Sequence, residues 1–324
     1  MRVLGITSKG WCGVEEAMNN ILGVTSEMAT TNLISMSHPP DVRLYRQQII
    51  QFNPSVIIMG GYGPSFEFIF NTFRGKVFVV LWCSNILQSE ISDEMNRLNS
   101  VIEMLKGRRI RSIAFIEKNS LQIMKTYHPS LNFSYFPIFS TPKEHCEKIE
   151  FKPKDAFHVD IFCTPNGRKN IYNQVAALHE FCKIHVNYDQ GIYTKSFEHM
   201  RNVINHGRFK QHELFSYIKS MNLGVQASLN ESYNYVVGDH LLLGVPVLSS
   251  MFVPAIAEID DSLIKKYLIA QDVNDINEIK EKVMFLKNNP SLMAELSERC
   301  KTGFEACCAS RKAEMKINLE KIIK

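Results

Sequence analysis

Short apolar runs alternate with amphipathic segments through the first half of the chain, and this alternation constrains the fold more than any other feature. Four runs have the length and composition of buried strands: RVLGI (2–6), SVIIMGG (55–61), KVFVVLW (76–82) and SIAFIE (112–117). Helices are expected between them, near residues 14–22 and 92–105. Apolar strands separated by helices form parallel sheets that are covered on both faces. The pattern therefore predicts a doubly wound α/β domain.

The same alternation starts again after a polar stretch at residues 139–157, which carries two prolines within STPKEHCEKIEFKPKDA. Further strands are expected at HVDIFC (158–163), KIHVNY (183–188), LGVQAS (223–228) and PVLSS (246–250), with helices between them. The polar stretch is typical of an interdomain linker. We therefore predict two Rossmann-like domains, residues 1–145 and 155–305, followed by a C-terminal helix at 306–324. A cleft between two such domains is a common ligand site.

The composition is that of an ordinary globular protein. Of 324 residues, 45% are hydrophobic and 22% are charged, and the net charge of +4 permits an anionic partner without requiring one. The chain has no run of about eighteen apolar residues, and its N-terminus lacks the pattern of a signal peptide. We expect a cytoplasmic protein with no transmembrane segment. The eight cysteines show no C-x-x-C or zinc-type spacing, which predicts structural roles for most of them.

Two acidic residues stand eight apart in the stretch NESYNYVVGDHLLLGVPVLSS, residues 230–250. Glu231 belongs to a loop that follows a predicted strand, and Asp239 lies less than two turns into the next predicted helix. The crevice beyond the carboxyl ends of the strands is the ligand site of an open α/β sheet, and a helix N-terminus there suits a phosphate. Both carboxylates are therefore placed to contact one ligand, as acceptors for sugar or ribose hydroxyls.

This stretch resembles the E-x7-E region of the retaining family 4 glycosyltransferases, which have the glycosyltransferase B (GT-B) fold. Glu231 and Asp239 stand at the two acidic positions, and Gly244-Val245-Pro246-Val247 begins the next strand as in the family. Upstream, CTPNGRKNIYNQVAALHEF is similar to the family's G-R…K-N element, with Arg168 and Lys169 as its basic residues. The resemblance covers roughly residues 158–305. Over the first half it rests on architecture and on one glycine-containing loop.

The resemblance implies a retaining glycosyltransferase that uses a nucleotide-sugar donor and needs no metal. Arg168 and Lys169 would neutralise the charge on the leaving diphosphate. Glu231 would hold hydroxyls of the donor sugar, and Asp239 would hold the nucleotide ribose. Further donor-binding positions implied by the pattern are Asn230, Ser232, Tyr233, Asn234, Gly10 and Gly13. The C-terminal helix would cross back to the first domain, as is common in this fold.

The sequence also departs from the family pattern. Where the family has E-G-F-G, this chain has Glu231-Ser232-Tyr233-Asn234. Asparagine tolerates a positive φ better than most residues do, so Asn234 can stand where a glycine is usual. A histidine that is frequent in the first domain of the family has no counterpart here. These departures leave open a sugar-nucleotide-binding or scaffold protein that has kept the fold and lost turnover.

The first domain supplies the expected acceptor side. Gly10 and Gly13 follow the first strand in TSKGWCGVEEAM, either as a loop that approaches the donor or as a plain tight turn. Trp82, Ser84 and Asn85 end the third strand in LWCSNILQSE and are expected to face the acceptor.

The densest positive patch of the sequence is KGRRIRS, residues 106–112. A solvated loop is one interpretation of this patch, and contact with phosphates is the other. A transferase of DNA bases, as some bacteriophages have, is therefore a further alternative. The sequence does not identify the donor nucleotide or the acceptor.

Overall fold

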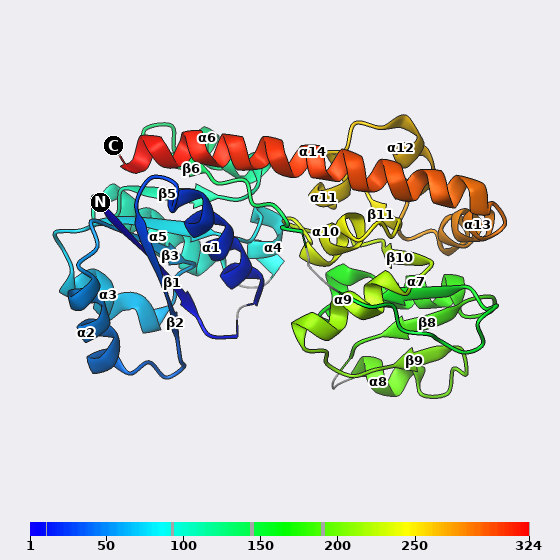
Figure 1. The fold of residues 1–324 in the computed structure, drawn as a ribbon. Coiled ribbons are helices and arrows are strands. Elements are labelled where there is room, and N and C mark those ends of the chain that lie inside the picture. The colour runs from blue at the N-terminus through cyan, green and yellow to red at the C-terminus, as the bar shows by residue number, and fades with distance from the viewer. Residues whose placement is uncertain (11, 92–93, 143–145, 189–191, 324) are drawn as a thin grey trace. The chain divides into compact units, whose positions relative to one another are not determined.

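The computed structural model describes residues 1–10, 12–91, 94–142, 146–188 and 192–323 (Figure 1). The chain divides into two compact units. Unit 1 contains residues 1–139 and 309–324, and unit 2 contains residues 140–308. Each unit has its own six-stranded sheet, in which every strand pairing is parallel.

The sheet of unit 1 has the strand order β2-β1-β3-β4-β5-β6. Its strands are β1 (Arg2–Ser8), β2 (Thr30–Met36), β3 (Val56–Gly60), β4 (Val77–Trp82), β5 (Ser112–Phe115) and β6 (Phe133–Tyr135). The helices between them are α1 (Cys12–Thr25), α2 (Val42–Phe52), α3 (Glu67–Thr72), α4 (Ile86–Ile91), α5 (Met95–Lys106) and α6 (Lys118–Tyr127), with a 3-10 turn, η1 (Pro64–Phe66), before α3.

Helices cover both faces of this sheet, which explains why its inner strands are mostly apolar. On one face, Leu4 and Ile6 of β1 belong to a core cluster that includes buried residues of α2, α3 and α5. On the other face, a Cβ on Gly5 would lie 2.8 Å from the side chain of Met18 in α1. Glycine at this position of β1 therefore allows α1 to pack close to the sheet.

The sheet of unit 2 has the order β12-β11-β10-β7-β8-β9. Its strands are β7 (His158–Ile161), β8 (Lys183–Val186), β9 (Val203–Asn205), β10 (Leu223–Gln226), β11 (Val247–Ser250) and β12 (Ile269–Ala270). Its 3-10 turn and helices are η2 (Gly167–Lys169), α7 (Ile171–Leu178), α8 (Ile192–Phe197), α9 (Gln211–Lys219), α10 (Tyr235–Leu242), α11 (Pro254–Ala257), α12 (Ser262–Leu268), α13 (Ile276–Lys287) and the first part of α14 (Pro290–Ile323).

A buried histidine fixes α10 against this sheet. His240 Nε2 lies 2.7 Å from Asp160 Oδ2 on β7, and His240 Nδ1 lies 2.7 Å from the carbonyl oxygen of Val236. Both ring nitrogens face acceptors, an arrangement that favours the doubly protonated ring. Burial alone would lower the pKa of His240, but the Asp160 carboxylate outweighs it and raises that pKa above its usual value. The ring fits because β10 has glycine at position 224, directly beneath it.

The polar stretch before β7 packs on unit 2. The backbone N–H of Ile149 donates to Ser220 Oγ at 2.6 Å, and Lys219 Nζ donates to the carbonyl of Cys146 at 2.8 Å. At the other end of the chain, the last part of α14 belongs to unit 1. There Arg311, which is buried, donates to the carbonyl of Ile138 at 2.9 Å.

The α/β fold class predicted from the sequence is confirmed, with two doubly wound parallel sheets. Every strand expected from an apolar run is present. Four strands were not expected, and they are β2, β6, β9 and β12, the edge strands of the two sheets. Among the described helices, none has the length and apolar character that crossing a bilayer requires.

Candidate functional site

The candidate site lies in unit 2, where two neighbouring strands end. The turn η2 follows β7, and the loop at residues 227–234 follows β10. Because β7 and β10 pair in parallel, their carboxyl ends meet at the same edge of the sheet. The turn carries Arg168 and Lys169, and the loop carries Glu231. The structure therefore brings together three of the residues that the sequence analysis singled out.

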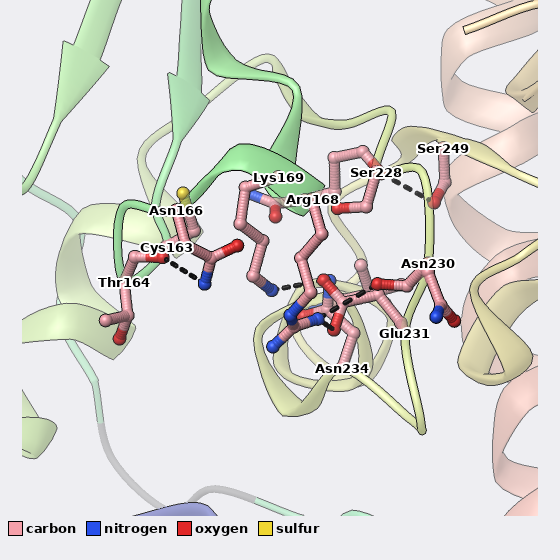
Figure 2. A network of polar contacts seen from close by, with 12 residues as sticks. Cys163, Thr164, Asn166, Arg168, Lys169, Ser228, Asn230, Glu231, Asn234 and Ser249 are labelled. Carbon is pink, nitrogen blue, oxygen red and sulfur yellow. Dashed lines mark hydrogen bonds and ion pairs between the residues drawn. The ribbon is translucent and has the colours of Figure 1, made fainter. Parts of the chain in front are cut away.

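These three side chains form one ionic group, as Figure 2 shows. Arg168 Nη1 lies 2.5 Å from Glu231 Oε2, and Lys169 Nζ donates to the other carboxylate oxygen, Oε1. Arg168 also donates to the carbonyl oxygen of Asn230 at 2.9 Å. In the other direction, the backbone N–H of Leu229 donates to the carbonyl of Arg168 at 2.8 Å. Turn and loop are thus joined through both side chains and backbone.

Burial makes this group electrostatically strong. The exposed fraction of the side chain is 4% for Glu231, 10% for Lys169 and 21% for Arg168. Burial by itself would raise the pKa of Glu231, but the charges of Lys169 and Arg168 outweigh it and hold that pKa below its usual value. The carboxylate is therefore ionised at neutral pH. Two positive charges stand against one negative charge, and the most exposed of the three side chains is a guanidinium.

Two residues that the sequence analysis did not assign hold the turn in place. Asn170 adopts a left-handed backbone, with φ of 54°, between η2 and α7, and its Nδ2 donates to the carbonyls of Ala227 and Val273. Gln174 donates to the carbonyl of Lys169 at 2.6 Å and accepts from the N–H of Ala227 at 3.1 Å. A signal for Asn170 was present in the sequence, because asparagine between a turn and a helix favours a positive φ.

The loop after Glu231 turns into α10 through Asn234. Asn234 has φ of 72°, which agrees with the expectation that it stands where the family has glycine. Its Oδ1 accepts from the N–H of Val237 at 3.3 Å and caps α10, and its Nδ2 lies 3.4 Å from Glu231 Oε1. Asn230 and Ser232 are both buried, at 8% exposure.

Tyr233 is buried more deeply than its neighbours in this loop. Its side chain is 2% exposed, and its hydroxyl lies 3.5 Å from Ser140 Oγ. The ring also packs edge-on against Tyr235, with 5.1 Å between the ring centroids. This position favours a packing role for Tyr233, while its contact with a donor stays a prediction.

Asp239 lies in the middle of α10, buried at 6% exposure. Its carbonyl accepts from the N–H of Leu243 within the helix, at 3.0 Å. The charge of the Asp239 carboxylate also contributes to raising the pKa of the adjacent His240. The assignment of Asp239 to a nucleotide ribose stays a prediction.

The remaining expected residues belong to unit 1, at the carboxyl ends of β1 and β4. Gly10 follows β1 with φ of 92°, a conformation that favours glycine, and a Cβ there would meet no atom within 4 Å. Gly13 lies in the first turn of α1, also in open space. Ser84 is half-buried after β4. Asn85 is buried, and its Oδ1 accepts from the N–H of Gln88 at the start of α4.

Trp82 differs from the expectation that it faces a ligand. The side chain is 4% exposed and belongs to the hydrophobic core of unit 1. Its indole Nε1 donates to Ser89 Oγ at 3.1 Å. A buried tryptophan needs such a partner for its N–H, so α4 supplies it and the ring packs inward. Trp82 is the last residue of a strand that is buried at almost every position.

No three His, Cys, Asp or Glu side chains gather as metal ligands within the described part of the chain. The expectation that no metal takes part stays a prediction. What the described group can do chemically is bind an anion. The guanidinium and the ammonium are held in place by a buried carboxylate, so they need little rearrangement to meet developing negative charge.

Comparisons with known proteins bear on the fold. No protein-family model matches the sequence, and no curated protein matches it significantly. Among solved structures, sucrose-phosphate synthase from Thermosynechococcus elongatus is similar, with a TM-score of 0.76 and 10% identity over 100% of this chain and 99% of the other.

Two other solved structures are similar as well. A trehalose-6-phosphate synthase has a TM-score of 0.71 and 11% identity over 99% of both chains. A pneumococcal O-GlcNAc transferase, solved with UDP and GlcNAc, has a TM-score of 0.61 and 12% identity over 86% of this chain and 60% of the other. At these identities the likeness establishes the fold alone. The chain has the GT-B fold, as the sequence resemblance implied.

Proposed function

We propose that the protein is a glycosyltransferase that moves a sugar from a nucleotide-sugar donor to an acceptor hydroxyl. The observation that carries this proposal is the buried group of Arg168, Lys169 and Glu231 at the carboxyl edge of the unit 2 sheet. The fold supports it, since the similar structures include transferases, one of them solved with UDP and GlcNAc. Fold alone would not suffice, because one fold can host many activities.

In the proposed reaction, Arg168 and Lys169 contact the donor diphosphate. When the bond between the anomeric carbon and the diphosphate oxygen breaks, its electron pair leaves with the diphosphate, and the two cations stabilise the added charge. The acceptor oxygen forms the new bond to the anomeric carbon, and its proton passes to the released phosphate. We propose retention of configuration and no metal; a similar structure comes from work on glycosyl transfer with retention.

Glu231 has two tasks in this proposal. It holds both cations in position, which the hydrogen bonds to its two oxygens already achieve. It also accepts a hydrogen bond from a hydroxyl of the donor sugar, while Asp239 accepts one from the ribose. The N-terminus of α10, capped by Asn234, adds a partial positive charge beside the carboxylate.

The test is release of nucleoside diphosphate from UDP-, GDP-, ADP- and TDP-sugars, with and without candidate acceptors. We expect release from one nucleotide class. Arg168→Ala should lower kcat about a hundredfold, because it removes a charge that acts on the leaving group. Lys301→Ala is the matched control, since Lys301 is an exposed cation on α14 in the same unit.

The same assay distinguishes this proposal from a non-catalytic binding protein and from a DNA-base transferase. Saturable binding of a sugar nucleotide without turnover, under all acceptor conditions, would support the non-catalytic binding or scaffold protein. Turnover that requires duplex DNA would support the DNA-base transferase. None of the three similar structures is named as a protein that acts on DNA. The anomeric configuration of the product, followed by NMR, tests retention.

A further inference from the structure

A second concave site lies in unit 1, at the sheet edge where the strands begin. A cavity of about 590 Å³ opens beside the first residues of β4, the C-terminal end of α5 and the turn after α6. Its volume falls in the range of small-molecule sites. Because the strands are parallel, Gly10 and Ser84 lie at the opposite edge of this sheet. The cavity is therefore separate from the residues expected to face the acceptor.

The lining of this cavity is strongly basic. Six cationic side chains contribute to it: Arg74, Lys76, Lys106, Arg108, Arg109 and Arg111. Its described lining contains no Asp or Glu. Apolar side chains, including Val77, Phe78 and Leu131, complete the wall. We call this site the Arg108 pocket.

Two of the six cations are balanced by acidic residues at its rim. Lys106 Nζ lies 2.7 Å from Glu103 Oε1. Arg109 Nη2 donates to Asn71 Oδ1 at 2.9 Å and lies 3.8 Å from Glu67 Oε1. These two residues therefore contribute little net charge to the pocket.

The other four keep their charge. Lys76 Nζ donates to Asn53 Oδ1 at 2.9 Å, which is a neutral acceptor. Among the residues that the structure describes, no ion pair or side-chain hydrogen bond holds the guanidinium of Arg74, Arg108 or Arg111. Like charges gathered in one concavity repel one another, so they are disfavoured unless an anion joins them.

Packing and helix dipoles explain only part of this arrangement. The helices α3, α5 and α6 all end near this edge, and the partial negative charge of a helix C-terminus attracts cations. Lys106, in the last turn of α5, fits that role. A helix dipole alone does not explain Arg108. Its backbone has φ of 56°, where glycine or asparagine would be less strained. The turn thus carries an arginine at a position whose backbone geometry favours other residues.

We propose that the Arg108 pocket binds a small ligand that carries two or more phosphate groups. Guanidinium groups bind phosphate through paired hydrogen bonds, and several of them around one cavity match a ligand with several phosphates. The apolar wall at Val77 and Leu131 can contact the remainder of such a ligand. The size of the cavity argues for a small molecule rather than a polymer.

The test is titration calorimetry with inorganic tripolyphosphate as the probe. The variant is the double substitution Arg108→Gly and Arg111→Gln, in which glycine suits the backbone at position 108. The matched control is Arg43→Gln with Arg46→Gln, which removes two exposed charges from α2 in the same unit. All three proteins carry Arg168→Ala, because the candidate site of unit 2 is also expected to bind phosphate groups. In that background we expect the pocket variant to raise the Kd about tenfold, and the control to leave it within about twofold.

Several results would overturn the proposal. An equal loss in the control would indicate general charge attraction, and binding that the pocket substitutions do not weaken would place the probe elsewhere. A duplex oligonucleotide that binds more tightly than tripolyphosphate, with affinity rising with its length, would indicate a nucleic-acid surface instead. An unchanged Kd together with a lower unfolding temperature in the pocket variant would mean that these arginines stabilise the helix C-termini and bind no ligand.

Discussion

At the scale of single residues, Glu231 is the centre of the candidate site. Its carboxylate is buried, yet it stays ionised because each oxygen accepts from a cation. Arg168 and Lys169 were recognisable from the sequence as basic residues of a strand-to-turn element. Glu231 was recognisable as well, but its ion pairs with them were not, because it is more than sixty residues away along the chain and only the pairing of β7 with β10 brings the loops together.

We predict that Glu231→Ala destabilises the fold. The substitution leaves two buried cations side by side without their counter-ion, and breaking a buried ion pair in this way costs about 3 kcal/mol of unfolding free energy. Urea unfolding at neutral pH measures the loss. Asp260→Ala is the comparison, since it breaks the exposed pair of Lys265 and Asp260 and should barely move the unfolding midpoint. Equal effects in both variants would contradict the role assigned to burial.

A chain of three histidines in unit 2 predicts a pH dependence. His185 Nε2 lies 2.9 Å from His158 Nδ1, and His185 Nδ1 lies 2.8 Å from His206 Nε2. Each contact joins two ring nitrogens, so one donates and the other accepts when the rings are neutral. Burial, and then the neighbouring His206 and His158, lower the pKa of His185 to about 3. The folded state therefore resists protonation of this ring.

We expect the unfolding free energy to fall as the pH drops below about 6.5, where histidine in the unfolded chain takes up a proton that folded His185 does not. The contribution of His185 is fully present above that pH and decreases by about 1.4 kcal/mol per pH unit below it. Denaturant unfolding at several pH values measures the slope. His185→Phe should reduce the slope, whereas His199→Gln, at an exposed position, should leave it unchanged. A slope that survives in His185→Phe would contradict the prediction.

At the scale of elements, the inner strands of both sheets were predictable and the edge strands were not. Inner strands such as β3 are buried at every residue, so their sequence is a continuous apolar run. The edge strand β2 is buried only at Ile34 and Met36 along TTNLISM, and β9 has only three residues. An edge strand buries less surface and needs less apolar sequence, so hydrophobicity does not reveal it. The burial of Trp82 was missed because the partner of its indole lies on a later helix.

The contact between α10 and β10 gives a prediction at this scale. A Cβ on Gly224 would lie 2.6 Å from His240 Cδ2, and the histidine ring is fixed by Asp160 and by the carbonyl of Val236. We expect Gly224→Ala to cost about 1–3 kcal/mol of unfolding free energy, since the ring has no free direction in which to move. Because α10 begins at the candidate site, the same variant should weaken donor binding.

Thermal unfolding and donor titration measure both effects. Gly75→Ala is the matched control, because a Cβ at position 75 meets no atom within 4 Å. If the two alanine variants were equally stable, the close approach of α10 to the sheet would not constrain position 224.

At the scale of the whole molecule, one architecture occurs twice in the chain. Each unit has a parallel six-stranded sheet, and in each the expected ligand residues follow the carboxyl ends of inner strands. Gly10 follows β1 in unit 1, and Arg168 follows β7 in unit 2. This repetition was readable from the sequence, because each half shows the same alternation of apolar runs and helices. The identity of donor and acceptor was not, because it depends on loops that no periodic pattern describes.

Arg168, Lys169 and Glu231 are proposed to bind the diphosphate of a nucleotide-sugar, and the first measurement to make is thermal unfolding with a panel of UDP-, GDP-, ADP- and TDP-sugars. A ligand at about a hundred times its Kd stabilises the folded state by about 2.7 kcal/mol, which is a measurable shift. We expect a shift with one nucleotide class that Arg168→Ala abolishes and Lys301→Ala retains. No shift with any sugar nucleotide, or an undiminished shift in Arg168→Ala, would contradict it.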